Sequence, residues 1–89
     1  MIYDKIVNSH QKLEVNQMHI AQKLKELRLD RDLRQSDIAT VIGTTQQYYG
    51  QYELGKRTIP AEHIATLCRF YGVSADYVLG LPKGLEWPR

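Results

Sequence analysis

Residues 35–54 read QSDIATVIGTTQQYYGQYEL, and this block predicts two short helices separated by a tight turn. The first helix has its apolar residues on one face: Ile38, Ala39 and Ile42. Gly43 ends this helix, because glycine adopts the left-handed conformation of a helix C-cap without steric cost. Thr45 is the expected N-cap of the second helix, which runs to about Leu54 and ends at Gly55. The block therefore predicts a close helix pair joined by a sharp turn.

Helical spacing continues on both sides of this block. Upstream, a first helix has apolar residues at helical intervals, namely Ile20, Leu24 and Leu27, with Leu33 following a charged stretch. Downstream, Pro60 is expected in the first turn of a fourth helix that ends at Gly72. The residues that this fourth helix buries are Ile64, Leu67, Cys68 and Tyr71.

A fifth helix is expected after Ser74, which is placed as its N-cap. Val73 and Val78 are spaced as a hydrophobic staple across that cap, and Leu79 and Leu81 close the domain. Strand signals are missing, so the sequence predicts an all-α fold of five short helices. Helices this short are unstable alone and have to pack on a shared core.

The two ends of the chain extend beyond these helices. Residues 1–19 are expected to form a further helix, with one apolar side made by Tyr3, Ile6, Val7, His10 and Leu13. This segment docks on the chain's own core or on a second subunit, unless translation begins at Met18. The tail over residues 82–89 has no helical period and is expected to be extended, with Trp87 as an anchor.

Composition narrows the class of protein. The chain has 89 residues, 43% of them hydrophobic and 25% charged, which is enough for one folded domain. A single cysteine, Cys68, excludes an internal disulfide and suits a reducing, cytoplasmic location. No apolar run approaches the roughly 20 residues of a membrane helix. The net charge of +2 is small, so any nucleic-acid binding has to rely on a local basic patch.

Catalysis and metal binding have no support in the sequence. There is no nucleophile–base set, no glycine-rich phosphate loop and no pair of carboxylates placed for a cleft. His10, His19 and His63 lack metal-ligand spacing with one another and with Cys68. We therefore expect neither an enzyme nor a cofactor.

The block over residues 35–54 resembles the helix-turn-helix of the phage-repressor family (Cro and cI-like, or XRE). The resemblance covers about residues 20–81, with LKELR upstream and YELGKR and YGVSADYVLGL downstream. The segment GTTQQ, with a further glutamine at position 51, is most similar to the 434-type repressors, which are among the known examples of this motif. The resemblance implies a five-helix, lambda-repressor-like DNA-binding domain whose recognition helix covers residues 45–54.

One polar face of that helix carries the expected base contacts. Gln46, Gln47, Gly50 and Gln51 fall on one side at about 100° per residue. A carboxamide can make two hydrogen bonds to adenine in the major groove, so the glutamines suit A·T pairs. Gly50 is expected to allow close approach to the groove. Tyr48, at the edge of the face, contacts a thymine methyl or a sugar, or else covers the core. The alternative is a face of ordinary solvated polar residues.

Contacts to the DNA backbone are expected around this face. The resemblance implies that Gln35 touches a phosphate at the start of the first motif helix, helped by its backbone N–H and the helix dipole. The other expected backbone contacts are Thr44, Thr45, Lys56, Arg57 and Arg34. For Lys56 and Arg57, a solvated loop is the alternative.

The resemblance also implies a structural ion pair between Arg28 and Glu53, which sets the pose of the recognition helix. Three positions depart from the family pattern. Tyr49 stands where Ile or Val is usual, so its hydroxyl needs space and a partner. Arg34 replaces a usual N-cap residue and loses about 1 kcal/mol of capping. Asp32 replaces a turn glycine and tolerates left-handed geometry.

Two functions follow as hypotheses. The first is a transcriptional repressor that binds a palindromic double-stranded operator as a homodimer, because one recognition helix covers only a few base pairs. The second is a protein-interaction module, such as an antitoxin or the partner of an antirepressor. The N-terminal extension and Trp87 would then hold a protein partner.

Overall fold

The computed structural model describes residues 18–81, and within that range the chain forms five helices and no strand. A first helix covers residues 18–30. The others are α2 (Gln35–Ile42), α3 (Gln46–Glu53), α4 (Ala61–Tyr71) and α5 (Ala75–Leu79). The expected all-α fold is confirmed over these residues. The expected helix before Met18 and the extended tail over residues 82–89 lie outside them.

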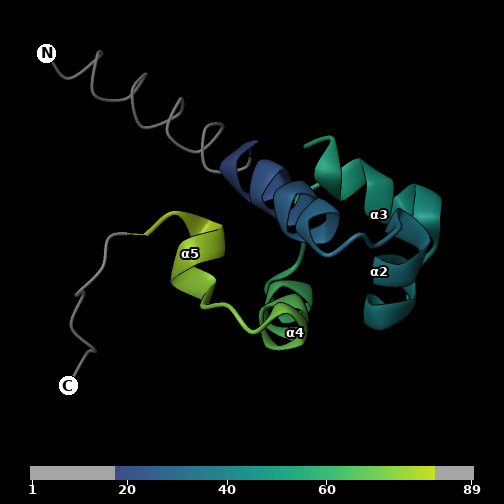
Figure 1. Cartoon of the computed structure of the whole chain (residues 1–89). Coiled ribbons are helices and arrows are strands. Elements are labelled where there is room, and N and C mark those ends of the chain that lie inside the picture. The colour runs from purple at the N-terminus through teal and green to yellow at the C-terminus, as the bar shows by residue number, and fades with distance from the viewer. Residues whose placement is uncertain (1–17, 82–89) are drawn as a thin grey trace, which may run out of the picture.

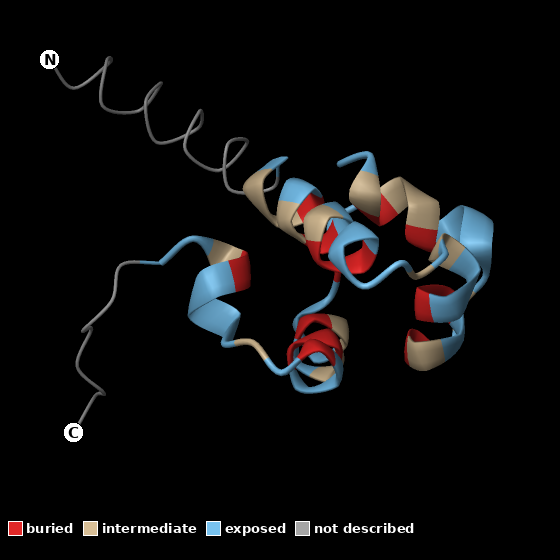
Figure 2. Ribbon diagram, in the orientation of Figure 1, coloured by how far each residue is buried: buried red, intermediate tan, exposed pale blue. Residues whose placement is uncertain are grey.

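Helix 18–30 and α4 lie in the middle of the molecule (Figure 1). Figure 1 shows α2 and α3 together at one end and α5 at the other, with helix 18–30 and α4 between them. The buried residues lie on the sides of the helices that face one another (Figure 2). One core cluster joins residues of helix 18–30 with residues of α2, α3, α4 and α5 and with Ile59. All five helices are therefore held by one shared core.

The turn between α2 and α3 is built as expected. Gly43 caps α2 at a φ of 75°, in the left-handed region, and its N–H bonds back to Ala39 and Thr40. The next N–H, of Thr44, donates to the Ala39 carbonyl at 2.8 Å. Thr45 then caps α3 by accepting from the backbone N–H of Tyr48 at 3.1 Å. These bonds fix the angle at which α3 leaves α2.

The second half of the core follows the sequence with two corrections. The four apolar residues expected on α4 are buried, and Gly72 and Ser74 cap α4 and α5 as expected. Pro60, however, is the N-cap of α4, one residue before the first turn, because its extended ψ of 149° is incompatible with the helix. Leu81 does not close the domain. It follows the Gly80 cap and its side chain is 44% exposed.

The turn before α2 confirms the expectation for Asp32 and adds one contact that the sequence analysis does not include. Asp32 adopts a φ of 54°, so it replaces the turn glycine in the left-handed region as expected. At the start of α2, the Asp37 carboxylate accepts from the backbone N–H of Arg34 at 2.8 Å. This is one half of a capping box, and it offsets part of the cap lost through Arg34. The spacing of three residues between Arg34 and Asp37 is the signal that could have revealed it.

Candidate DNA-binding surface

The two sides of α3 have opposite environments. Tyr49 and Tyr52 face inward; Tyr49 is fully buried and Tyr52 is 5% exposed. The two rings meet edge to face, with centroids 6.4 Å apart. Because these large side chains anchor the inner side in the core, the outer side of α3 faces solvent. Gln46 and Gln47 are exposed there, in the first turn of the helix.

Tyr48 lies at the edge of this outer side, as the sequence indicates. Its side chain is 41% exposed and its ring meets the ring of Tyr52 edge to face, at 5.6 Å. It therefore covers part of the core and still presents a face outward. The guanidinium carbon of Arg57 lies 4.8 Å from the centroid of the Tyr48 ring.

Arg57 also contacts the half-buried Gln51, in the second turn of α3. The Nε–H of Arg57 donates to Oε1 of Gln51. The backbone N–H groups of Lys56 and Arg57 donate to the main-chain carbonyl of Gln51, at 2.9 and 3.3 Å. The turn after α3 thus folds back along the outer side of the helix. Helical spacing does not reveal this contact; the sequence predicts Arg57 only as a contact to the DNA backbone or as a solvated loop residue.

The other expected backbone contacts surround this outer side. Thr45, Lys56, Arg57 and Arg34 are exposed, and Thr44 is half-buried in the turn. The Thr45 hydroxyl uses an acceptor lone pair for its cap and keeps its O–H as a donor. Three basic side chains therefore stand at the two ends of the helix pair, while the glutamine face between them is uncharged.

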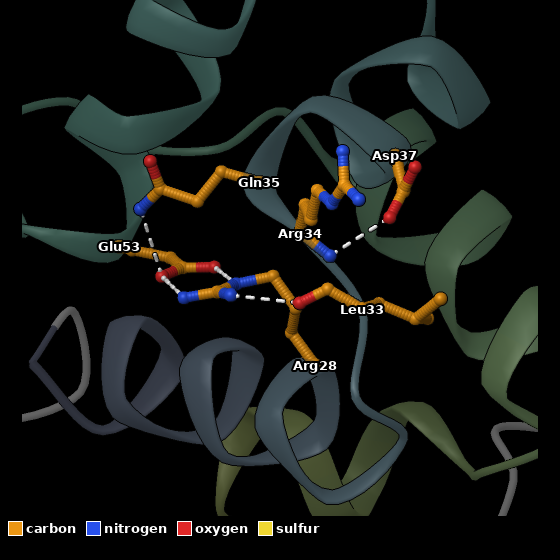
Figure 3. A network of polar contacts seen from close by, with 6 residues as sticks. All are labelled: Arg28, Leu33, Arg34, Gln35, Asp37 and Glu53. Carbon is orange, nitrogen blue, oxygen red and sulfur yellow. Dashed lines mark hydrogen bonds and ion pairs between the residues drawn. The ribbon is translucent and has the colours of Figure 1, made fainter.

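Gln35 is half-buried, and its side chain packs between α2 and α3. Its Nε2 donates to Oε1 of Glu53 at 3.2 Å, as Figure 3 shows. Its Oε1 would lie 3.2 Å from a Cβ added at Gly50. Gly50 therefore makes room for the side chain of Gln35, a role that the sequence analysis does not include.

A buried ion pair joins helix 18–30 to the end of α3 (Figure 3). Arg28 holds both carboxylate oxygens of Glu53: Nε donates to Oε2 at 2.8 Å and Nη2 to Oε1 at 3.0 Å. Its Nη1 donates to the carbonyl of Leu33 at 2.9 Å, in the turn before α2. The Arg28 side chain is 11% exposed and that of Glu53 is 3% exposed. One guanidinium thus connects three segments behind the outer side of α3.

The electrostatics of this network follow from its contacts. Burial by itself would raise the pKa of Glu53, but the hydrogen bonds from Arg28 and Gln35, together with the nearby Tyr49 hydroxyl, outweigh it and lower that pKa below its usual range. The hydrogen bond to Glu53 raises the pKa of Arg28. Both groups are therefore charged at neutral pH, and the pair provides two parallel, charge-assisted hydrogen bonds.

Tyr49 occupies the interior beside this pair. Burial, followed by the adjacent Glu53 carboxylate, raises the pKa of Tyr49, so the hydroxyl remains protonated. The hydroxyl lies near Glu53 without a hydrogen bond of good geometry to any group in the described part of the chain. The structure therefore supplies the space that a tyrosine needs here, but not an ideal partner for its O–H.

Residues 18–81 contain neither a metal-binding cluster nor a membrane-spanning helix. No group of three or more His, Cys, Asp or Glu residues in this range is placed to hold a metal ion. No helix in the same range is long and apolar enough to span a membrane.

Comparison with known proteins relates this architecture to a family. A model of the helix-turn-helix family matches residues 24–78. The uncharacterized HTH-type transcriptional regulator YobD of Bacillus subtilis (strain 168) is 38% identical over 60 residues, covering 67% of this chain and 54% of the relative. The cryptic phage CTXphi transcriptional repressor RstR of Vibrio cholerae is 39% identical over 51 residues, covering 57% and 46%.

A third similarity is to an antitoxin. Antitoxin PezA of Streptococcus pneumoniae serotype 4 is 30% identical over 67 residues, covering 75% of this chain and 42% of the relative. The chain spans about half the length of these relatives. The resemblance seen in the motif residues is confirmed, because the family model covers more than half of the chain: the protein belongs to the helix-turn-helix family.

Proposed function

We propose that the chain is a sequence-specific, double-stranded DNA-binding regulator of transcription that places α3 in the major groove. The observation that carries this proposal is the outer side of α3, where Gln46 and Gln47 are exposed while the opposite side is fixed in the core. Carboxamides held on a rigid helix suit bidentate contact with adenine N6 and N7. Two of the relatives are named as transcriptional regulators or repressors, which supports the same activity here.

The surrounding side chains suit the phosphates on either side of the groove. Thr44, Thr45, Lys56, Arg57 and Arg34 would make these contacts, which fix the position of the protein without reading sequence. Gln35 would take part through its backbone N–H at the N-terminus of α2. One N–H of its side-chain amide already donates to Glu53, and the second N–H can donate to a phosphate oxygen.

The protein would act as a homodimer and as a repressor. One α3 reaches only a few base pairs, so useful affinity requires two copies on a palindrome with half-sites about one helical turn apart. Repression is supported by the relative that is named as a phage repressor. With DNA as its target, the protein would act in the cytoplasm as a binding protein without a catalytic step.

Selection of bound DNA from a random pool tests the proposal. We expect a palindromic sequence containing A·T pairs at the positions that face Gln46 and Gln47. Enrichment of no sequence, or affinity that depends only on salt and not on sequence, would contradict it.

The similarity to PezA favours a second candidate, a role as an antitoxin that holds a protein partner. Both functions are compatible in one chain, because the outer side of α3 need not take part in the protein contact. Expression together with the neighbouring genes distinguishes them. A partner that co-purifies with the chain, without any selected DNA sequence, would favour the antitoxin over the regulator.

A further inference from the structure

The turn after α3 holds one glutamine of the outer side in a fixed orientation. Three contacts place Arg57 against the helix: its backbone N–H on the Gln51 carbonyl at 3.3 Å, its Nε–H on Gln51 Oε1, and its guanidinium over the ring of Tyr48 at 4.8 Å. Arginine carries donors only, so the atom of Gln51 that faces it has to be the carboxamide oxygen. The amide nitrogen of Gln51 therefore points away from Arg57.

This orientation decides which base edges Gln51 can meet. Pairing with adenine uses both ends of a carboxamide, the oxygen on N6–H and the nitrogen on N7. In Gln51 the oxygen is turned toward Arg57, which uses one of its two lone pairs, so the group that the side chain turns away from Arg57 is its NH₂ donor. Guanine presents two acceptors, N7 and O6, on its major-groove edge, whereas adenine presents one acceptor and a donor that would oppose the NH₂ group.

The first two glutamines of α3 differ from Gln51 in this respect. In the described part of the chain, Gln46 and Gln47 make no side-chain hydrogen bond, so their carboxamides are free to turn toward either kind of edge. Of the three glutamines, Gln51 is the one whose side chain accepts from Arg57.

We propose that Arg57 is a positioning residue that makes Gln51 a hydrogen-bond donor, so that the base pair facing Gln51 is read as guanine rather than adenine. This rests on the proposed DNA-binding function. The positive charge of Arg57 beside the Gln51 amide acts in the same direction, because it favours an acceptor-rich base edge.

The test is selection from a random DNA pool by the wild-type chain and by three variants, followed by titration of the selected site with each base at every position. Gln51→Ala identifies the position that Gln51 faces. Arg57→Ala releases the carboxamide. Lys56→Ala is the matched control, because it removes an equal charge from the adjacent exposed residue, whose side chain makes no hydrogen bond to Gln51. Thermal unfolding checks that each variant is folded.

For the wild-type chain we expect guanine at the Gln51 position, favoured over adenine by about tenfold, within the range of one good base contact. In Arg57→Ala this preference should fall to near parity or shift to adenine, with the preferences at the Gln46 and Gln47 positions unchanged. Lys56→Ala should lower the affinity for all sequences alike.

Two results would overturn the role of Arg57 without contradicting the proposed function. One is a wild-type preference for adenine at the Gln51 position. The other is an Arg57→Ala variant that keeps the wild-type preference for guanine at the Gln51 position and loses affinity for every sequence by the same factor, because a phosphate contact alone would account for that loss. A wild-type chain that selects no sequence would instead contradict the proposed function, and this role with it.

Discussion

The inner side of α3 carries the buried Tyr49 and Tyr52, which the core holds, and Glu53, whose buried side chain is held by Arg28. The outer side carries Gln46 and Gln47, which are exposed and make no hydrogen bond to any side chain in the described residues. A helix of eight residues would not be stable alone, so its inner side has to supply the stability that presents its outer side. Substitutions on the inner side should therefore change folding, and substitutions on the outer side should change binding.

The largest effect is expected from Arg28→Met, which leaves the Glu53 carboxylate buried without its cation. We expect the free energy of unfolding to fall by about 3–5 kcal/mol, measured by chemical denaturation. The double variant Arg28→Met, Glu53→Leu should recover much of this loss, because both charges are removed. Arg69→Met, at an exposed arginine of α4, is the control and should change stability by less than about 0.5 kcal/mol. A loss equally small in Arg28→Met would show that the pair does not hold α3.

Acid should lower the free energy of unfolding through Glu53, on the inner side of α3. The pKa of Glu53 is lower in the folded chain than its unfolded value of about 4.3, so its contribution is fully present above that value. The contribution is lost as the pH falls through the lowered pKa of the folded state. Unfolding measured from pH 7 to pH 2 should show a loss of stability below about pH 4.

In Glu53→Gln, stability at neutral pH should be lower and the acid dependence should be smaller. Glu62→Gln, at an exposed carboxylate of α4, serves as its control and should keep the wild-type dependence. An unchanged acid profile in Glu53→Gln would contradict the buried-pair interpretation.

Thr45 lies where the two sides meet, at the N-cap of α3. Thr45→Ala removes the acceptor for the Tyr48 N–H and should cost about 1 kcal/mol of stability. Thr45→Ser keeps the hydroxyl and should retain nearly all of it. Denaturant unfolding of the pair measures the difference, and equal stability of the alanine and serine variants would show that the cap contributes nothing.

The smallest change in stability is expected from Tyr49→Phe. The tyrosine hydroxyl is buried without a well-formed hydrogen bond, so its removal should alter the free energy of unfolding by less than about 1 kcal/mol in either direction. Thermal denaturation can measure this. A loss of several kcal/mol would mean that the Tyr49 O–H to Glu53 contact is part of the network.

The sequence predicts the helix ends and the buried residues better than the contacts on the outer side of α3. The end of α2 follows from Gly43, and the start of α5 from Ser74, because caps depend on local backbone geometry. Helical spacing likewise identifies the buried residues of α4. Leu81 was misplaced because a leucine beyond the last helix has no periodicity that fixes its direction.

The contacts of the outer side depend on distances that spacing does not encode. Arg57 reaches Gln51 only because the turn after α3 folds back, and Gln35 reaches Gly50 from another helix. Arg28 and Glu53 are 25 residues apart in the chain, and only the family resemblance indicates that they form an ion pair. Helical spacing places the glutamines on one face, and the family resemblance adds the expectation that this face contacts DNA.

Substitution of Gln47 by alanine, measured in two assays, tests the division between the sides of α3 most directly. Unfolding should stay within about 0.5 kcal/mol of wild type, because Gln47 is exposed. Affinity for the selected site, measured by mobility shift, should fall by about 1–3 kcal/mol. Gln22→Ala, at an exposed glutamine of helix 18–30, should change neither quantity appreciably. A Gln47→Ala variant that binds the selected site as tightly as wild type would contradict base reading by the outer side of α3.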